Sequence, residues 1–137
     1  MSTPVIEAAI YNQLNAFATA ASITIVYRNT KYTPVEGTSY IEEYILPNVP
    51  TQDGIGTQAR NRYRGILQLT VVTPEDTGKA DFNTLYNTLG SYFKRGVPVI
   101  HNGTTIQIER VAVGDDRGDS PWYKRNIDIY YRCDLDN

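Results

Sequence analysis

The chain has little of what enzymes and secreted proteins commonly use. It contains one cysteine and one histidine among 137 residues, and no apolar run approaches the roughly 20 residues of a membrane-spanning helix. A lone cysteine cannot form an internal disulfide, so the fold must be held by its core. Nothing at the N-terminus combines a basic region with a long apolar run, which predicts synthesis and folding in a reducing cytoplasm.

An excess of charge is also missing. The 13 basic residues against 15 acidic ones give a formal charge of −2, so nothing draws the chain as a whole toward nucleic acid or an anionic membrane. A domain of this length buries about two-thirds of its unfolded surface, which is enough for a core without metals. We therefore predict a single domain, 1–137, that binds neither membranes nor a specific nucleic acid.

The residue types that carry catalysis are too few to build a site. His101 precedes Asn-Gly in a predicted turn, where a surface role explains it better than catalysis. Cys133 lies among apolar neighbours, as an inert core thiol does. The acidic cluster Asp115, Asp116 and Asp119 lacks the regular ligand spacing of a calcium loop. We expect no catalytic, metal-binding or cofactor-binding residues, and no cofactor.

The most informative segment of the sequence runs from Tyr63 to Phe93. Leu67, Leu69 and Val71 alternate onto one face of a strand that Pro74 ends, while the other face is also largely apolar. This strand is therefore predicted to lie inside a sheet, nearly buried on both faces. An amphipathic helix that ends in Phe93 follows, with its apolar stripe at Phe82, Leu85, Tyr86, Leu89 and Phe93.

The remaining elements complete an α+β pattern. A first helix starts at Ser2 or Thr3 and runs to about Thr19, and its core stripe is Ile6, Ala9, Ile10, Gln13, Leu14 and Phe17. Asn102-Gly103 between two apolar runs predicts a tight hairpin, followed by a bulge near Glu109-Arg110. Further strands are predicted at 23–27, 39–46 and 122–133. We predict a mostly antiparallel β-sheet with two helices packed on one face.

Three polar segments are predicted to be loops: Arg28–Gly37, Asn48–Ala59 and Gly114–Pro121. The second is long for a compact domain and combines glycines with little apolar content. The chain also has 11 tyrosines but only 3 phenylalanines. Tyrosine suits surfaces that become dry on assembly, but it is also common in half-exposed strands, and the sequence leaves both interpretations open.

In its order of elements the chain resembles the tail terminator, or tail-completion, family of long-tailed bacteriophages. The resemblance covers roughly Val5 to Cys133 and includes the Leu46-Pro47 strand end, the Gly65–Leu69 strand, the Asp76–Gly78 turn, the Phe93 helix and the Trp122-Tyr123 strand. It implies a structural virion protein of the tail, not an enzyme. Such a protein assembles in the host cytoplasm into a hexameric ring, caps the tail tube, stops its polymerisation and joins it to head-neck proteins.

Contact residues are expected in and beside the first two loops. The hypothesis is that these loops become ordered on contact with the tube or a neighbouring subunit. Arg60, Arg62 and Arg64 alternate onto one face as a stripe of positive charge, which either protects a strand edge or meets an acidic patch on a partner. The full set of interface candidates is Tyr32, Tyr40, Tyr44, Gln52, Asp53, Ile55, Arg60, Arg62 and Arg64.

Two alternatives remain open from the sequence. The chain could be another tail or neck component, either a tube subunit or a head-tail adaptor, because these can share small α+β folds. It could also be a ligand-binding α+β domain with a pocket between sheet and helices. A terminator stops at a ring, a tube subunit polymerises, and a ligand-binding domain has a deep, dry pocket.

Overall fold

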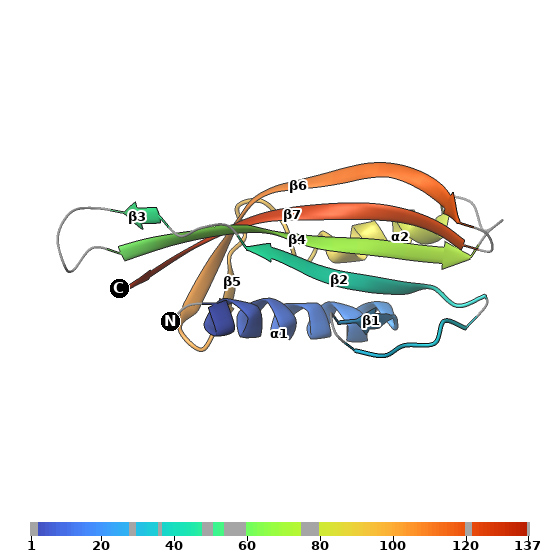
Figure 1. Cartoon of the computed structure of the whole chain (residues 1–137), viewed down its shortest axis with the longest axis horizontal. Coiled ribbons are helices and arrows are strands. Elements are labelled where there is room, and N and C mark those ends of the chain that lie inside the picture. The colour runs from blue at the N-terminus through green and yellow to red at the C-terminus, as the bar shows by residue number, and fades with distance from the viewer. Residues whose placement is uncertain are drawn as a thin grey trace.

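A computed structural model describes residues 3–27, 30–35, 37–47, 51–53, 60–74, 80–119 and 122–136, and the statements that follow concern this part of the chain (Figure 1). Two helices and seven strands follow one another in it. They are α1 (Thr3–Ala21), β1 (Thr24–Val26), β2 (Tyr40–Pro47), β3 (Thr51–Asp53), β4 (Arg60–Pro74), α2 (Ala80–Leu89), β5 (Val99–His101), β6 (Thr104–Asp119) and β7 (Trp122–Asp136).

The strands form one curled sheet with the order β1-β2-β4-β7-β6-β5. β1 runs parallel to β2, whereas the other described strand pairs are antiparallel. β4 and β7 pair along their whole lengths, from Arg60↔Asp136 to Pro74↔Trp122. They extend beyond β2 as an arm that also carries β3 (Figure 1). The predicted α+β class and mostly antiparallel sheet are confirmed.

The core lies between the helices and one face of the sheet. Along α1 the buried stripe is Ile6, Ala9, Ile10, Leu14 and Phe17, as the sequence predicts. Gln13 lies at the margin of this stripe and donates a hydrogen bond of 2.9 Å from Nε2 to the carbonyl of Tyr92. The sheet contributes Ile41, Ile45, Leu67, Leu69, Val71, Ile106, Ile108, Ile127, Ile129, Tyr131 and Cys133. One side of the sheet is thereby covered.

The prediction for the central strand holds for one of its faces. Leu67, Leu69 and Val71 are buried against the helices. On the opposite face, Ile66, Gln68 and Thr70 are only half-buried, because neither described helix covers that side. Val72, the fourth predicted residue of that face, is fully buried, so the expectation of a strand nearly buried on both faces is wrong from Ile66 to Thr70 and holds at Val72.

The hairpin between β5 and β6 is confirmed. Asn102 and Gly103 both have positive φ, 49° and 80°, as a tight two-residue turn between twisted strands requires. The predicted bulge also exists, since the pairing of β6 with β7 shifts between Ile108 and Arg110. The bulge restores the inward direction to Val111 and Val113, which pair with buried residues of β7.

Three predicted boundaries are wrong. α2 ends at Leu89, whose carbonyl accepts bonds from the amides of Tyr92 and Phe93, so Phe93 reaches the core from a turn. Residues 51–53 of the predicted second loop form β3, because they pair with β4; positions 48–50 and 54–59 lie outside the described residues. Residues 114–119 of the predicted third loop continue β6, since ladder pairing with β7 overrides their polar, glycine-containing sequence.

Candidate interface on the outer sheet face

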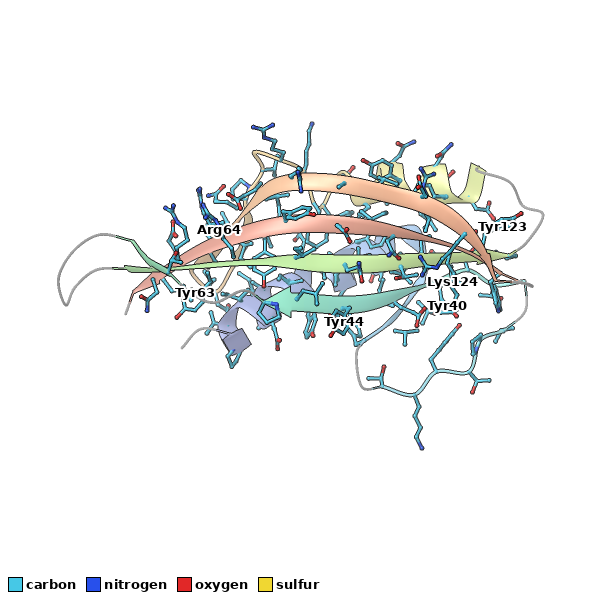
Figure 2. The ribbon with its side chains drawn as sticks, turned by 45° about the horizontal axis from the view of Figure 1, so that its top comes forward. Tyr40, Tyr44, Tyr63, Arg64, Tyr123 and Lys124 are labelled. Atoms are coloured by element: carbon cyan, nitrogen blue, oxygen red, sulfur yellow. The ribbon has the colours of Figure 1, made fainter. Side chains whose placement is uncertain are left out.

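The outer face is the side of β2, β4, β6 and β7 that lies away from both helices. α1 and α2 lie behind the strands in Figure 2, and no helix of the described residues covers the side turned toward the viewer. Along β4 this face carries every second residue from Arg62 to Val72, and their partners on β2 and β7 point the same way. Among the described residues, this face of the sheet is the one that neither helix covers.

Its centre is an apolar row that crosses the sheet. Leu46 pairs with Ile66, Ile66 with Tyr130 and Tyr130 with Arg110, so one residue from each of four strands lies in line. Leu46 is 39% exposed, and the guanidinium carbon of Arg110 lies 4.1 Å from the centre of the Tyr130 ring. A shallow cavity of about 370 Å³ opens beside this row, between Leu46, Ile66 and Tyr130. An apolar centre with charged neighbours is the usual composition of a protein contact surface.

A network of ion pairs borders the row on the side of the arm. Arg62 Nε lies 2.9 Å from Asp134 Oδ1, and Arg64 Nε lies 3.6 Å from Glu109 Oε1. Arg132 bridges the two carboxylates at 4.0 Å each. The sequence predicts a stripe of positive charge here. Arg62 and Arg64 each have a carboxylate partner on β7 or β6, and the three guanidinium groups of the network face two carboxylates, so the ion pairs offset most of this charge.

On the other side of the row the outer face is polar. Gln68 donates to Asp128 at 3.2 Å and Thr70 donates to Asn126 at 2.9 Å, each across the β4–β7 pair. Tyr44 stands beside Gln68 and is 38% exposed (Figure 2). These cross-strand bonds hold the polar side chains in fixed positions.

An aromatic cluster closes the far end of the outer face. Tyr32 lies 4.9 Å from Tyr40, and Tyr40 packs edge-on against Trp122 at 5.8 Å, both measured between ring centres. Tyr40 is only 6% exposed as a result. Its ring supports Tyr32 and cannot itself meet a partner directly.

The structure distributes the interface candidates over three places. Tyr44, Arg62 and Arg64 share the outer face. Tyr32 and Tyr40 lie in the aromatic cluster, while the backbones of Gln52, Asp53 and Arg60 pair within the arm. Ile55 lies outside the described residues. Sequence reasoning missed Leu46, Ile66, Glu109, Tyr130 and Asp134, which only the register across strands brings to this face.

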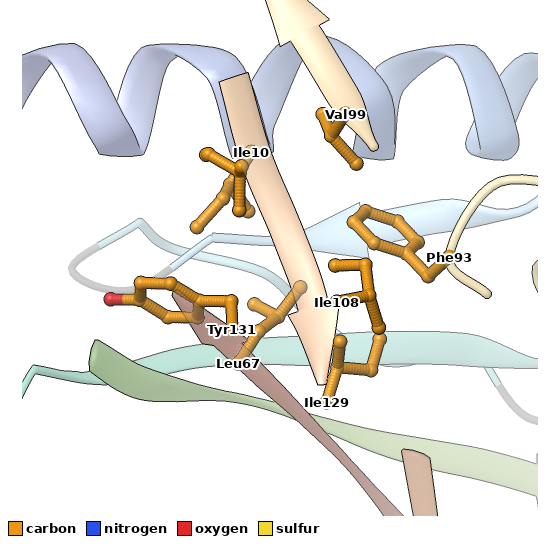
Figure 3. A pocket seen from close by; sticks show the side chains of 8 residues that line it. Ile10, Leu67, Phe93, Val99, Ile108, Ile129 and Tyr131 are labelled. Atoms are coloured by element: carbon orange, nitrogen blue, oxygen red, sulfur yellow. The ribbon is translucent and has the colours of Figure 1, made fainter. Parts of the chain in front are cut away.

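The space between α1 and the sheet is filled by side chains. Ile10, Phe93 and Val99 meet Leu67, Ile108, Ile129 and Tyr131 there, and the gap among them has no volume that a water molecule could occupy (Figure 3). Burial, followed by the charges of Glu7 and Cys133, raises the pKa of Tyr131 to about 12. This core is packed rather than hollow, unlike a ligand-binding pocket.

Another tyrosine, Tyr11, faces a buried carboxylate. Glu43 is 4% exposed on the inner face of β2, and Tyr11 of α1 makes a side-chain hydrogen bond with it. Burial raises the pKa of Tyr11 to about 12, and the charge of Glu43 adds to this effect. The pair fixes α1 against β2.

Two further searches concern the described residues alone. No group of three or more histidine, cysteine, aspartate or glutamate side chains in that part of the chain is arranged to hold a metal ion. Neither of its helices is long and apolar enough to cross a membrane.

Solved structures share the fold. One of them superposes with a TM-score of 0.78 at 24% identity, and the match covers 97% of this chain and 96% of the other. A chain from the virion of a native gene transfer agent particle superposes with a TM-score of 0.61 at 18% identity, covering 95% and 93%. No curated protein matches in sequence. These likenesses define the class, a small α+β protein with helices on one face of a curled sheet.

The sequence itself defines the family. Residues 5–131 match the model of the phage tail terminator protein family, a span that includes all but the first two residues of α1, the whole of α2 and most of the sheet. The chain therefore belongs to the phage tail terminator protein family, and it is a structural protein of the phage tail.

Proposed function

We propose that this chain caps the tail tube as a hexameric ring, stops tube polymerisation and joins the tail to head-neck proteins. The family match over residues 5–131 carries the proposal. The partners are then five further copies, the tube protein and a connector protein, and assembly takes place in the host cytoplasm before the protein joins the virion. No catalytic step is part of this function.

The outer face supports a contact role. It combines the apolar row Leu46, Ile66 and Tyr130 with the exposed Tyr44 and with arginines that ion pairs hold in place. Tyr44, Arg62 and Arg64 are the predicted interface residues that lie there. We assign the outer face to a contact with another virion protein, because a ring needs top and bottom surfaces distinct from its lateral ones.

The ligand-binding alternative has little support. The space between α1 and the sheet, where that alternative places its pocket, is closed to water among the described residues. A tube subunit and a head-tail adaptor remain structural alternatives within the virion. They differ from a terminator in assembly, because a tube subunit forms open filaments and a terminator stops at a ring.

The deciding experiment mixes the purified protein with tail tubes of the phage that encodes it. Negative-stain microscopy should show a cap at one end of each tube, and light scattering should show no filaments of the protein alone. Open filaments, or tubes without caps at saturating protein, would contradict the proposal.

A matched pair of variants tests the outer face. Ile66→Lys places a charge in the apolar row and should lower the fraction of capped tubes at least tenfold while the protein stays folded. Val97→Lys changes a 48% exposed valine in the turn before β5, which contributes no residue to the outer face, and should leave capping unchanged. Equal capping by both variants would remove the outer face from the proposal.

A further inference from the structure

A groove of one sign of charge lies between the end of α2, the turn that follows it and β6. It has a volume of about 660 Å³, and no carboxylate is among its lining residues. Lys94, Arg95 and Arg110 are exposed along it. The apolar part of the groove is formed by Tyr86, Phe93 and Val111.

The three cations of the groove have no acidic partner within the described part of the chain. No described carboxylate forms an ion pair with any of them, in contrast to Arg62 and Arg64 of the outer face. Arg110 stacks on the ring of Tyr130, which holds its guanidinium without neutralising it. Several like charges without a counter-charge attract an anionic partner.

The backbone that carries two of these cations is fixed. The amide of Val97 donates a hydrogen bond of 3.0 Å to the carbonyl of Lys94, and Gly96 has a φ of 85°. This is a tight turn with Arg95 at its second position and with glycine where φ must be positive. A turn of this kind needs little further ordering when a partner binds, so less free energy is lost on association.

The edge of β6 beside the groove favours a polypeptide as the partner. β6 lies along the upper edge of the sheet in Figure 1, and β5 pairs only with Thr104–Ile106. Beyond Ile106, β6 has a described strand on its β7 side alone. Between its two register shifts, Arg110–Val113 keeps a regular ladder with β7. Such an edge offers backbone donors and acceptors that an extended peptide can pair with and that a nucleic acid cannot match.

The carboxylates of the chain itself do not provide such a partner. Asp134 is held in an ion pair, and Asp128 accepts a hydrogen bond across the β4–β7 pair. Glu42, Asp81 and Asp115 are exposed but lie on three different elements. Among the described side chains, no strand therefore carries two exposed carboxylates. We assign the partner to a different protein for this reason.

We propose that this groove binds an extended acidic segment of another virion protein. The segment adds a strand to β6 at Arg110–Val113 and places its carboxylates beside Lys94 and Arg95. The inference rests on the proposed function only in placing the partner in the virion. It adds a contact surface at the sheet edge that is separate from the outer face.

A peptide array tests the proposal. Short overlapping peptides that cover the tube protein, the connector protein and this chain are probed with the purified, labelled protein. Acidic peptides of the tube or connector protein should be retained, and retention should weaken as salt rises from about 0.05 to 0.5 M. Retention of no acidic peptide, or of this chain's own peptides alone, would overturn the proposal.

A matched pair of double variants tests the cations. Lys94→Glu combined with Arg95→Glu should weaken binding of the retained peptide by roughly tenfold or more in fluorescence polarisation. Lys31→Glu combined with Arg117→Glu changes the net charge equally at two exposed positions outside the groove, and should weaken it by less than about twofold. Equal losses in the two proteins would remove the groove from the contact.

Methylation of the peptide backbone tests the added strand. In a strand paired at one edge, every second amide points to its neighbour, so N-methylation of one alternate set of residues should abolish binding while the other set is tolerated. Equal effects of the two sets would overturn the pairing with β6. Tighter binding of a poly-dT oligonucleotide than of any acidic peptide, lost in the Lys94→Glu and Arg95→Glu protein, would overturn the assignment to a polypeptide.

The two proposals can fail separately. Capped tubes without any retained acidic peptide would leave the terminator function intact and overturn the peptide site. Retained acidic peptides without capped tubes would support the peptide site and overturn the proposed function.

Discussion

Replacing Gly65 with alanine tests the packing where β2, β4 and β7 meet. An alanine Cβ at this position would lie 2.5 Å from Tyr131 Oη, 2.7 Å from Tyr131 Cζ and 2.8 Å from the backbone oxygen of Leu46. All three distances are shorter than a carbon can tolerate. The Tyr131 ring is 4% exposed and packed in the core, and the Leu46 oxygen belongs to a paired strand, so neither can move freely.

The expected cost follows from two opposed effects. Alanine in a strand interior is favoured over glycine by roughly 0.5–1 kcal/mol, because glycine loses more backbone freedom on folding. Forcing an extra carbon into a packed site costs about 1–3 kcal/mol, and more where backbone must shift. The difference is a net loss of about 0–2.5 kcal/mol in the free energy of unfolding, and we expect Gly65→Ala to lie in its upper half, at about 1–2.5 kcal/mol, because the Leu46 oxygen belongs to the backbone; Tm falls by several degrees.

A glycine of β6 offers a matched control. A Cβ at Gly114 of β6 would meet its nearest atoms at 3.6 and 3.8 Å, which is ordinary contact. Urea unfolding followed by fluorescence should show Gly114→Ala unchanged or up to about 1 kcal/mol more stable. A Gly65→Ala protein as stable as the Gly114→Ala protein would refute the reasoning. Adding Tyr131→Phe to Gly65→Ala should recover only part of the loss, because the ring carbon and the Leu46 oxygen remain.

Three further predictions concern the side chains of Tyr11, Arg62 and Tyr131. Tyr11→Phe removes a hydrogen-bond partner of the buried Glu43 and should lower the free energy of unfolding by about 1–3 kcal/mol, measured by urea unfolding. A decrease of less than about 0.5 kcal/mol would contradict the pairing. Arg62→Ala breaks the 2.9 Å ion pair with Asp134 and should cost about 1 kcal/mol or less, an effect that shrinks in roughly 1 M salt. The raised pKa of Tyr131 means that the folded state favours the neutral phenol. The stability that this provides is complete below about pH 10 and is lost as the pH rises toward 12. Tyr131→Phe should therefore lose less stability than the wild type between about pH 9 and 12, and parallel curves of stability against pH would refute this.

Local patterns in the sequence were enough to predict the inner face. The alternation of Tyr123, Ile127, Ile129, Tyr131 and Cys133 predicts one apolar face of β7. The last four are buried, whereas Tyr123, near the start of the strand, is 43% exposed. Asn102-Gly103 predicts the hairpin because few other dipeptides accept positive φ at both positions. Each of these signals lies within one element, so no knowledge of the partner strand is needed.

The outer face depends on register between strands, which one sequence does not show. Arg64 and Glu109 are 45 positions apart by number, yet β6 and β4 each pair with β7 and so bring them to 3.6 Å. Without that pairing, Arg62 and Arg64 look like free positive charge. The polar segment 114–119 is likewise indistinguishable from a loop until Lys124 and its neighbours pair with it. Long-range pairing therefore decided both the charge of the candidate interface and the length of β6.

The arrangement of covered and open surfaces connects the fold to assembly. Both helices pack on one face of the sheet, which leaves the outer face and the two sheet ends as separate surfaces with different chemistry. The outer face is apolar at its centre, whereas the groove between the end of α2 and β6 has Lys94, Arg95 and Arg110 exposed along it. A protein that contacts its own copies laterally and other proteins above or below needs unlike surfaces of this kind. If the outer-face charge in Ile66→Lys abolishes capping while light scattering shows the same assembly state as for the wild type, the lateral and axial contacts are independent, and each can be changed without the other.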